Sequence, residues 1–160
     1  MKEYEKTGVL SVKDINLPDA EHLRKGVAII ECVQEIPCNP CVTACPFNAI
    51  SMKDINSTPM VDFDKCVGCG KCISICPGLA IFVVKVRDDG FAEITMPYEF
   101  LPIPKIGEYV TLLDREGKKQ GKGKVLRIRE GSRRTFVVTV EVKEDLAMVV
   151  RNILVKGRGE

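Results

Sequence analysis

Eight cysteines lie between residues 32 and 76, and the 84 residues that follow Cys76 contain none. Thiols at this density form disulfides in an oxidising compartment and bind metals in a reducing one. The first six residues carry charges of both signs and lack the apolar stretch of a secretory signal. We therefore expect a cytoplasmic protein whose cysteines bind metal.

The cysteine segment repeats itself with an offset of 31 residues. The matching residues are Cys38, Cys41, Cys45, Pro46, Ala49 and Ile50 in the first copy and Cys69, Cys72, Cys76, Pro77, Ala80 and Ile81 in the second. From Cys66 the second copy reads C-x2-C-x2-C-x3-C-P, whereas from Cys32 the first reads C-x5-C-x2-C-x3-C-P. The longer spacing predicts a first loop with a shape of its own.

The second pattern is typical of a segment that binds 4Fe–4S clusters, in which the fourth cysteine ligates the other cluster of a pair. Three closely spaced thiolates can hold one cube, and its fourth ligand must come from another stretch of chain. We therefore predict two 4Fe–4S clusters with exchanged ligands. The expected ligands of cluster one are Cys32, Cys38, Cys41 and Cys76, and those of cluster two are Cys66, Cys69, Cys72 and Cys45.

Other metal centres fit these residues less well. Structural zinc favours separated C-x2-C pairs or histidine partners. A Rieske centre needs two histidines, but the sequence contains only His22, which we interpret as a surface residue. The C-x-x-C-H motif of a c-type haem is missing. Cys32 is the least constrained ligand, and the alternative for it is a buried free thiol.

The fold expected is α+β, with a pseudo-twofold cluster-binding domain followed by a small all-β barrel or sandwich. Strands are predicted on both sides of the cysteine loops, with single helical turns before Cys45 and Cys76. Three prolines between residues 97 and 104 predict a linker. The expected divisions are an N-terminal extension, 1–26, a dicluster domain, 27–96, the linker, 97–104, and a β domain, 105–160. No apolar run approaches the length of a membrane span.

The run from Cys66 to Pro77, the repeat and the Ala-Ile after each Cys-Pro resemble the bacterial two-cluster ferredoxin family over residues 27–87. The resemblance implies one-electron carriage by a non-catalytic protein. The whole chain also looks like the iron–sulfur subunits that accompany FAD-dependent amino-acid or amine dehydrogenases in anaerobic prokaryotes. Residues 31–41, Glu-Cys-Val-Gln-Glu-Ile-Pro-Cys-Asn-Pro-Cys, carry this narrower resemblance. A flavoprotein dehydrogenase is then the expected partner, and the alternative is a freely diffusing ferredoxin with a structural extension.

Charge divides the chain, because residues 1–97 carry a net −3 and residues 98–160 a net +5. We expect the acidic, cluster-bearing half to approach a basic face of its partner. The basic stretch of the other half comprises Lys118, Lys119, Lys122, Lys124, Arg127, Arg129, Arg133 and Arg134. It reads foremost as solvated hairpin edges, with a docking surface as the alternative. Nucleic acid is an unfavoured partner, because no aromatic residues alternate with these charges, although a zinc-bound RNA-binding module remains a third hypothesis.

Overall fold

The computed structural model describes residues 1–157. Its helices are α1 (Glu3–Thr7), α2 (Ala20–Lys25), α3 (Pro40–Ala44) and α4 (Lys71–Ile75), with 3-10 turns η1 (Val12–Asp14), η2 (Ser132–Arg134) and η3 (Glu144–Leu146). Its strands are β1 (Val27–Ile30), β2 (Ile50–Ser51), β3 (Met60–Val61), β4 (Ile81–Val86), β5 (Phe91–Tyr98), β6 (Tyr109–Leu113), β7 (Lys119–Glu130), β8 (Phe136–Lys143) and β9 (Asn152–Leu154). Within these residues, no helix has the length and apolar composition needed to cross a membrane.

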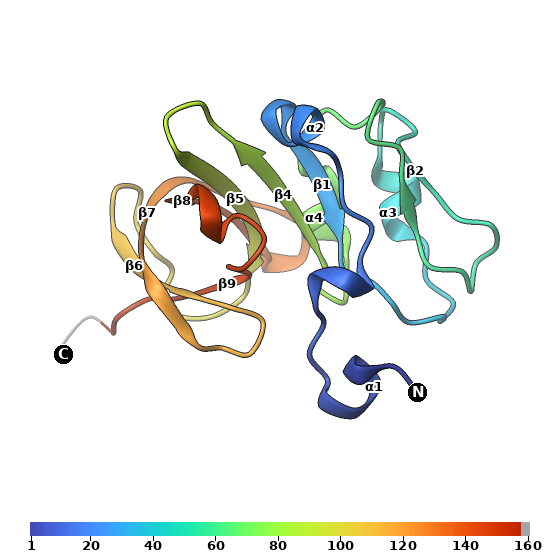
Figure 1. Cartoon of the computed structure of the whole chain (residues 1–160), viewed down its shortest axis with the longest axis horizontal. Coiled ribbons are helices and arrows are strands. Elements are labelled where there is room, and N and C mark those ends of the chain that lie inside the picture. Colours follow the sequence, from blue (N-terminus) through green and yellow to red (C-terminus); the bar gives the residue numbers. More distant parts are fainter. Residues whose placement is uncertain (158–160) are drawn as a thin grey trace.

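Seven strands form one antiparallel sheet in the order β1-β4-β5-β8-β7-β6-β9, and β2 and β3 form a separate small ribbon. Strands β5 to β9 curve around a common interior, while β1 and β4 extend the sheet towards α3, α4 and the ribbon (Figure 1). The expected small β domain is therefore present in outline. Its first strand, however, comes from the segment that the sequence assigns to the dicluster domain.

Strands β1 and β4 are buried on both faces because each face packs on a different core. Val27 and Ile29 of β1 join Phe82 and Val84 of β4 in the core that fills the curved part of the sheet. The alternate positions, Ala28, Ile30, Ile81 and Val83, belong to a second core that also contains Cys41 and Cys72. Successive side chains of a strand point to opposite faces, so these two strands are a wall shared by the cysteine loops and the β half.

The predicted linker starts two residues too early. Pro97 and Tyr98 lie in β5 and pair with Val137 and Phe136 of β8, so the connecting loop begins at residue 99. Proline is tolerated there because β4 pairs with β5 only as far as Thr95, which leaves the β4 side of Pro97 without a ladder partner. The two predicted domains thus share one sheet rather than being joined by a linker alone.

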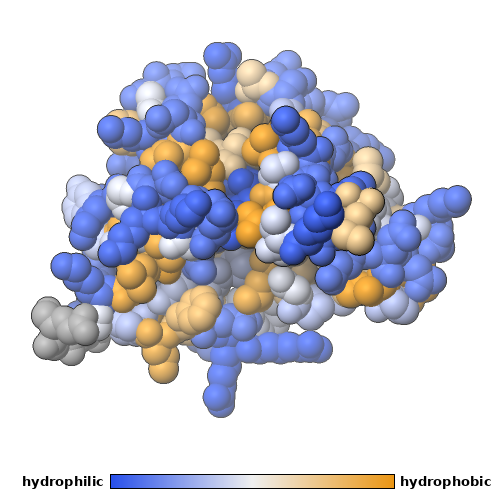
Figure 2. Space-filling model, turned by 60° about the horizontal axis from the view of Figure 1, so that its bottom comes forward, coloured by the Kyte–Doolittle hydropathy of each residue, from blue (hydrophilic) through white to orange (hydrophobic). Residues whose placement is uncertain are grey.

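Residues 158–160, at the end of the predicted β domain, lie outside the described residues. The lower face of the molecule is largely hydrophilic, with apolar side chains in separate patches (Figure 2). Large exposed apolar residues of the β half include Phe100, Leu101, Ile106 and Tyr109, all in or next to the loop between β5 and β6.

Candidate metal centre

The sequence repeat is also a structural repeat. Helices α3 and α4 begin and end at residues that are 31 positions apart, and each carries the middle cysteine of its C-x2-C-x3-C run, Cys41 or Cys72. Both are shorter than the average helix, with only five residues. In each copy the residue after the helix is the cysteine that precedes proline, and that proline fixes the backbone as the chain turns away.

The turns after the helices repeat in detail. Asn48 and Leu79 occupy equivalent positions and both adopt left-handed backbone conformations, with φ of 50° and 51°. Their amides donate to the carbonyl oxygens of Cys45 and Cys76 at 3.4 and 3.3 Å. One equivalence fails, because Gly70 is left-handed with φ of 72° whereas Asn39 has φ of −142°. Pro40 restricts the residue before it, as the distinct shape expected for the first loop requires.

Four cysteines from both copies surround one cavity. Cys32, Cys38 and Cys41 line it from the first copy and Cys76 from the second, around about 380 Å³ of space that includes its opening to solvent. The amide of Cys38 donates to the carbonyl oxygen of Ile55 at 3.1 Å, which anchors the first loop to the segment before β3.

A second cavity lies between the remaining cysteines. Its lining includes Cys66, Cys69 and Cys72 from the second copy and Cys45 from the first, around about 330 Å³ of space that again includes the opening. Gly68, between Cys66 and Cys69, has φ of 67°, and a Cβ atom there would lie 2.6 Å from the carbonyl oxygen of Gly26. Only glycine fits that close approach of loop and backbone.

The chemistry of both linings fits an iron–sulfur cluster. Four thiols surround a space in each case, and within residues 1–157 no three metal-binding side chains converge on a single ion. The amides of Ala28 and Ala49 point at the sulfurs of Cys66 and Cys45, each at 3.3 Å, and such bonds stabilise negative charge on sulfur. A 4Fe–4S cluster bound in such a space would take up and release one electron.

The two buried cysteine thiols do not ionise readily. Burial, together with the other cysteines of the same cavity, raises the pKa of Cys41 to about 11 and that of Cys72 to about 12. Both are therefore protonated at neutral pH in the metal-free chain. Thiolate ligands bind only after losing the proton, so metal uptake must release protons from these positions.

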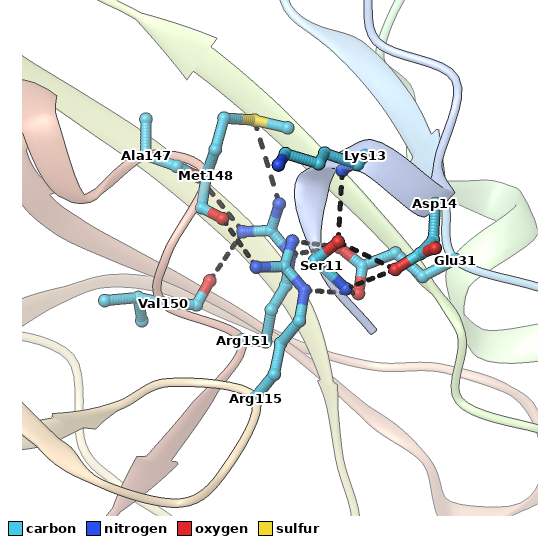
Figure 3. Close-up of polar contacts among 9 residues, drawn as sticks. All are labelled: Ser11, Lys13, Asp14, Glu31, Arg115, Ala147, Met148, Val150 and Arg151. Atoms are coloured by element: carbon cyan, nitrogen blue, oxygen red, sulfur yellow. Dashed lines mark hydrogen bonds and ion pairs between the residues drawn. The ribbon is translucent and has the colours of Figure 1, made fainter. Parts of the chain in front are cut away.

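A buried ionic network lies directly before Cys32 and is absent from the sequence-based expectations. The Glu31 carboxylate, with 7% of its side chain exposed, accepts hydrogen bonds from Arg115 at 2.6 and 3.0 Å and from Arg151 at 2.6 Å (Figure 3). Arg151 also donates to the carbonyl oxygens of Ala147 and Val150. Burial alone would raise the pKa of Glu31, but the two guanidinium groups outweigh it and hold that pKa below its usual value.

The β half also contacts residues at and near the second cavity. Arg129 of β7 donates to the carbonyl oxygen of Cys69 at 3.1 Å, and a Cβ atom on Gly70 would lie 2.8 Å from the same guanidinium. Ser132 donates to the carbonyl oxygen of Ser74 in α4 at 3.2 Å. The basic stretch is therefore not only a row of solvated edges. Its composition marks it in the sequence, but not its contact with a loop some 60 residues away.

His22 is less exposed than predicted. Its side chain is 17% exposed and bridges Asp19 at 2.7 Å and Asp64 at 2.9 Å. Hydrogen bonds to Asp64 and Asp19 raise the pKa of His22 above its usual value. The residue lies in neither cysteine cavity, and it ties α2 to the chain just before Cys66.

Comparison with known proteins agrees with this geometry. Residues 31–80 match the 4Fe-4S dicluster domain family, so this part of the chain is an iron–sulfur electron-transfer domain with two 4Fe–4S clusters. The chain is 34% identical over 79 residues to the polyferredoxin-like subunit of the aliphatic sulfonate oxidoreductase of Pyrococcus furiosus, a match that covers 46% of each chain. The chain thus spans less than half of that relative.

Two further relatives match shorter stretches of the chain. An uncharacterized ferredoxin of Methanocaldococcus jannaschii is 46% identical over 44 residues, or 28% of each chain. The dissimilatory-type sulfite reductase subunit beta of Archaeoglobus fulgidus is 39% identical over 66 residues, which are 41% of this chain and 16% of that subunit. No solved structure matches the chain.

Proposed function

We propose that the chain is a non-catalytic electron-transfer subunit with one cluster held by Cys32, Cys38, Cys41 and Cys76 and the other by Cys45, Cys66, Cys69 and Cys72. The observation that carries this proposal is the grouping of the eight thiols around two cavities, each with three cysteines from one copy of the repeat and one from the other. Such exchange of the fourth ligand is the arrangement expected for two 4Fe–4S clusters.

The partner proposed is a flavoprotein dehydrogenase, with electrons passing between its flavin and a further acceptor. The support is the resemblance of residues 31–41 to subunits of that kind, together with a relative whose description names it a subunit of an oxidoreductase. A reducing compartment such as the cytoplasm would keep the thiols available for iron.

The first test is chemical. Material prepared under anaerobic conditions should contain about eight iron atoms and eight acid-labile sulfides per chain, the content of two 4Fe–4S clusters. Zinc in place of iron would refute the proposal and favour the zinc-bound module. The second test is native mass spectrometry of the complex isolated without detergent. A flavin-containing chain bound in fixed ratio supports the subunit role, whereas a lone monomer contradicts it.

The second candidate, a freely diffusing ferredoxin, is favoured by one observation. The β half shares a sheet and a core with β1 and β4, so it stabilises the fold even without a partner. Removal of residues 98–160 does not separate the two candidates, because β5 would lose its neighbour β8 and the core would be exposed. The isolated native complex does separate them.

A further inference from the structure

The two cysteine cavities differ in their surface charge. Among the described residues, the lining of the first contains no charged side chain, and its non-cysteine members include Gln34, Ile36, Ser57 and Pro59. The lining of the second contains Lys71, and Arg129 reaches it through the Cys69 carbonyl oxygen. Within residues 1–157, a cation therefore lines the second cavity but not the first.

Cluster-two residues also come closest to the surface. Cys69 is the one exposed cysteine of the eight. Beside it in the same lining are two large exposed apolar side chains, Phe47 at 46% and Val67 at 55%. A partner that binds this apolar area would lie close to cluster two, because the area adjoins an exposed ligand of that cluster.

The β half supplies further positive charge to this end. Gly131 lies so close to Ser74 that an added Cβ atom would clash with the serine Cβ, and Ser132 is hydrogen-bonded to the same residue. These contacts hold η2 against α4, and η2 contains the exposed residues Arg133 and Arg134.

Two acidic groups near this end have ion-pair partners, and Glu99 accepts a hydrogen bond from Thr135. Asp64 is bonded to His22, and Asp62 to Lys65. Glu130 follows Arg129 in β7, and adjacent residues of a strand point to opposite faces. In contrast, none of the ion pairs found in the described residues involves Arg129, Arg133 or Arg134. Their charges are available to a partner.

We propose that the surface formed by Phe47, Val67, Cys69, Lys71, Arg129, Arg133 and Arg134, here called the cationic port, docks an acidic one-electron protein that exchanges electrons with cluster two. The inference rests on the proposed function. It reverses the expectation drawn from the net charge of the halves, because the basic half folds against the exposed edge of the acidic half. Complementary charge accelerates encounter between proteins, and the effect falls with ionic strength.

The test compares two acceptors of opposite charge, the acidic blue-copper protein plastocyanin and basic cytochrome c. In each reaction one electron leaves the reduced chain and reduces Cu(II) to Cu(I) or Fe(III) to Fe(II), with no proton transferred. Second-order rate constants are measured by anaerobic stopped-flow with the cluster-loaded full chain. Wild-type protein should reduce plastocyanin at least about tenfold faster at 20 mM than at 300 mM salt, and the cytochrome rate should not show this fall.

Two triple variants locate the effect. R129Q/R133Q/R134Q should reduce plastocyanin about tenfold more slowly than wild type at low salt. The control K118Q/K119Q/K122Q removes the same charge at the other end of β7, at least about 20 Å along the strand from Arg129, and should leave that rate nearly unchanged. Equal iron content and equal visible spectra show that each variant is loaded. The salt dependence of the wild-type rate tests the proposal without any variant.

Distinct results overturn distinct statements. Equal effects of the two triple variants would mean that only net charge matters. Faster reduction of cytochrome c by wild type at low salt would mean that the docking surface attracts a basic partner. Either result refutes the inference. Tight, arginine-dependent binding of polyuridylate RNA at 150 mM salt, without preference for plastocyanin, would assign the face to nucleic acid and also refute it. A loaded chain that reduces neither acceptor would instead refute the proposed function.

Discussion

The Glu31 network offers the most quantitative prediction on stability. Replacing Glu31 by Gln removes the carboxylate that two guanidinium groups share, while Arg151 stays 4% exposed and Arg115 13% exposed. Breaking a buried ion pair by removing one partner costs about 3–5 kcal/mol, because the remaining charge stays buried without compensation. In a chain of this size each 1 kcal/mol corresponds to roughly 2–4 °C in Tm, so we expect Glu31→Gln to lower Tm by about 6–20 °C.

The assay is thermal unfolding of the cluster-loaded chain under anaerobic conditions, followed by far-UV circular dichroism at a fixed scan rate. Loss of a cluster makes unfolding irreversible, so wild type and variants are compared as apparent Tm values at that rate. Equal iron content before heating separates lower stability from poor cluster assembly.

The matched control is Glu116→Gln. Glu116 pairs with Lys118 at 2.8 Å, but these side chains are 50% and 68% exposed. Exposed pairs contribute less than about 1 kcal/mol, so the control should change Tm by no more than about 4 °C. If Glu31→Gln lowers Tm no further than Glu116→Gln, then the buried network does not stabilise the junction between the β half and the first cysteine loop.

Three further predictions concern the cysteines, a glycine and the histidine. The double variant Cys45→Ala/Cys69→Ala should retain about half the wild-type iron, because both residues are proposed ligands of one cluster; loss of nearly all iron would show that the fourth ligands are not exchanged. Gly68→Ala should lower Tm far more than Gly117→Ala, since both have left-handed backbones but only Gly68 faces a carbonyl oxygen within 3 Å; equal losses would contradict this. Because the pKa of His22 is raised in the folded chain, the protonated side chain stabilises the fold. This contribution is complete below the pKa of histidine in the unfolded chain, about 6.5, and is lost as pH rises through the pKa in the folded chain. His22→Gln should therefore weaken the fall in Tm between pH 6 and pH 9, and identical pH profiles of the two proteins would refute the assignment.

The cysteine half was the more predictable part because its information is local. Cysteines, prolines and the Ala-Ile pairs recur at fixed spacing, and the backbone conformation repeats at the same spacing, as the left-handed Asn48 and Leu79 show. Leu79 itself carried no signal for this conformation, since a left-handed leucine is uncommon, whereas asparagine is enriched there. The strands of the β half followed from β-branched runs and glycine turns, but not their order in the sheet.

What the sequence could not provide is contact between residues far apart in the chain. Glu31 meets residues 84 and 120 positions later, and Arg129 meets a carbonyl oxygen 60 positions earlier. Each of these side chains, considered alone, resembles an ordinary surface charge. The interpretation of Pro97 was wrong for a related reason. A proline argues against a strand only where the adjacent strands on both sides pair with it, and this pairing depends on the whole sheet.

Because β1 and β4 present one face to the cysteines and the other to the β-half core, the boundary suggested by cysteine content and charge runs through a single folded unit. The contacts that cross this wall are unevenly placed. Next to Cys32 in the chain, two arginines are buried against Glu31, which neutralises them in part, whereas Arg129, Arg133 and Arg134 beside the second cavity remain exposed. The same β half therefore supplies buried ion pairs next to Cys32 and exposed positive charge beside the second cavity. If the cationic port guides an acidic partner, the two clusters have different roles despite their repeated motifs. Electrons then enter or leave the protein at cluster two.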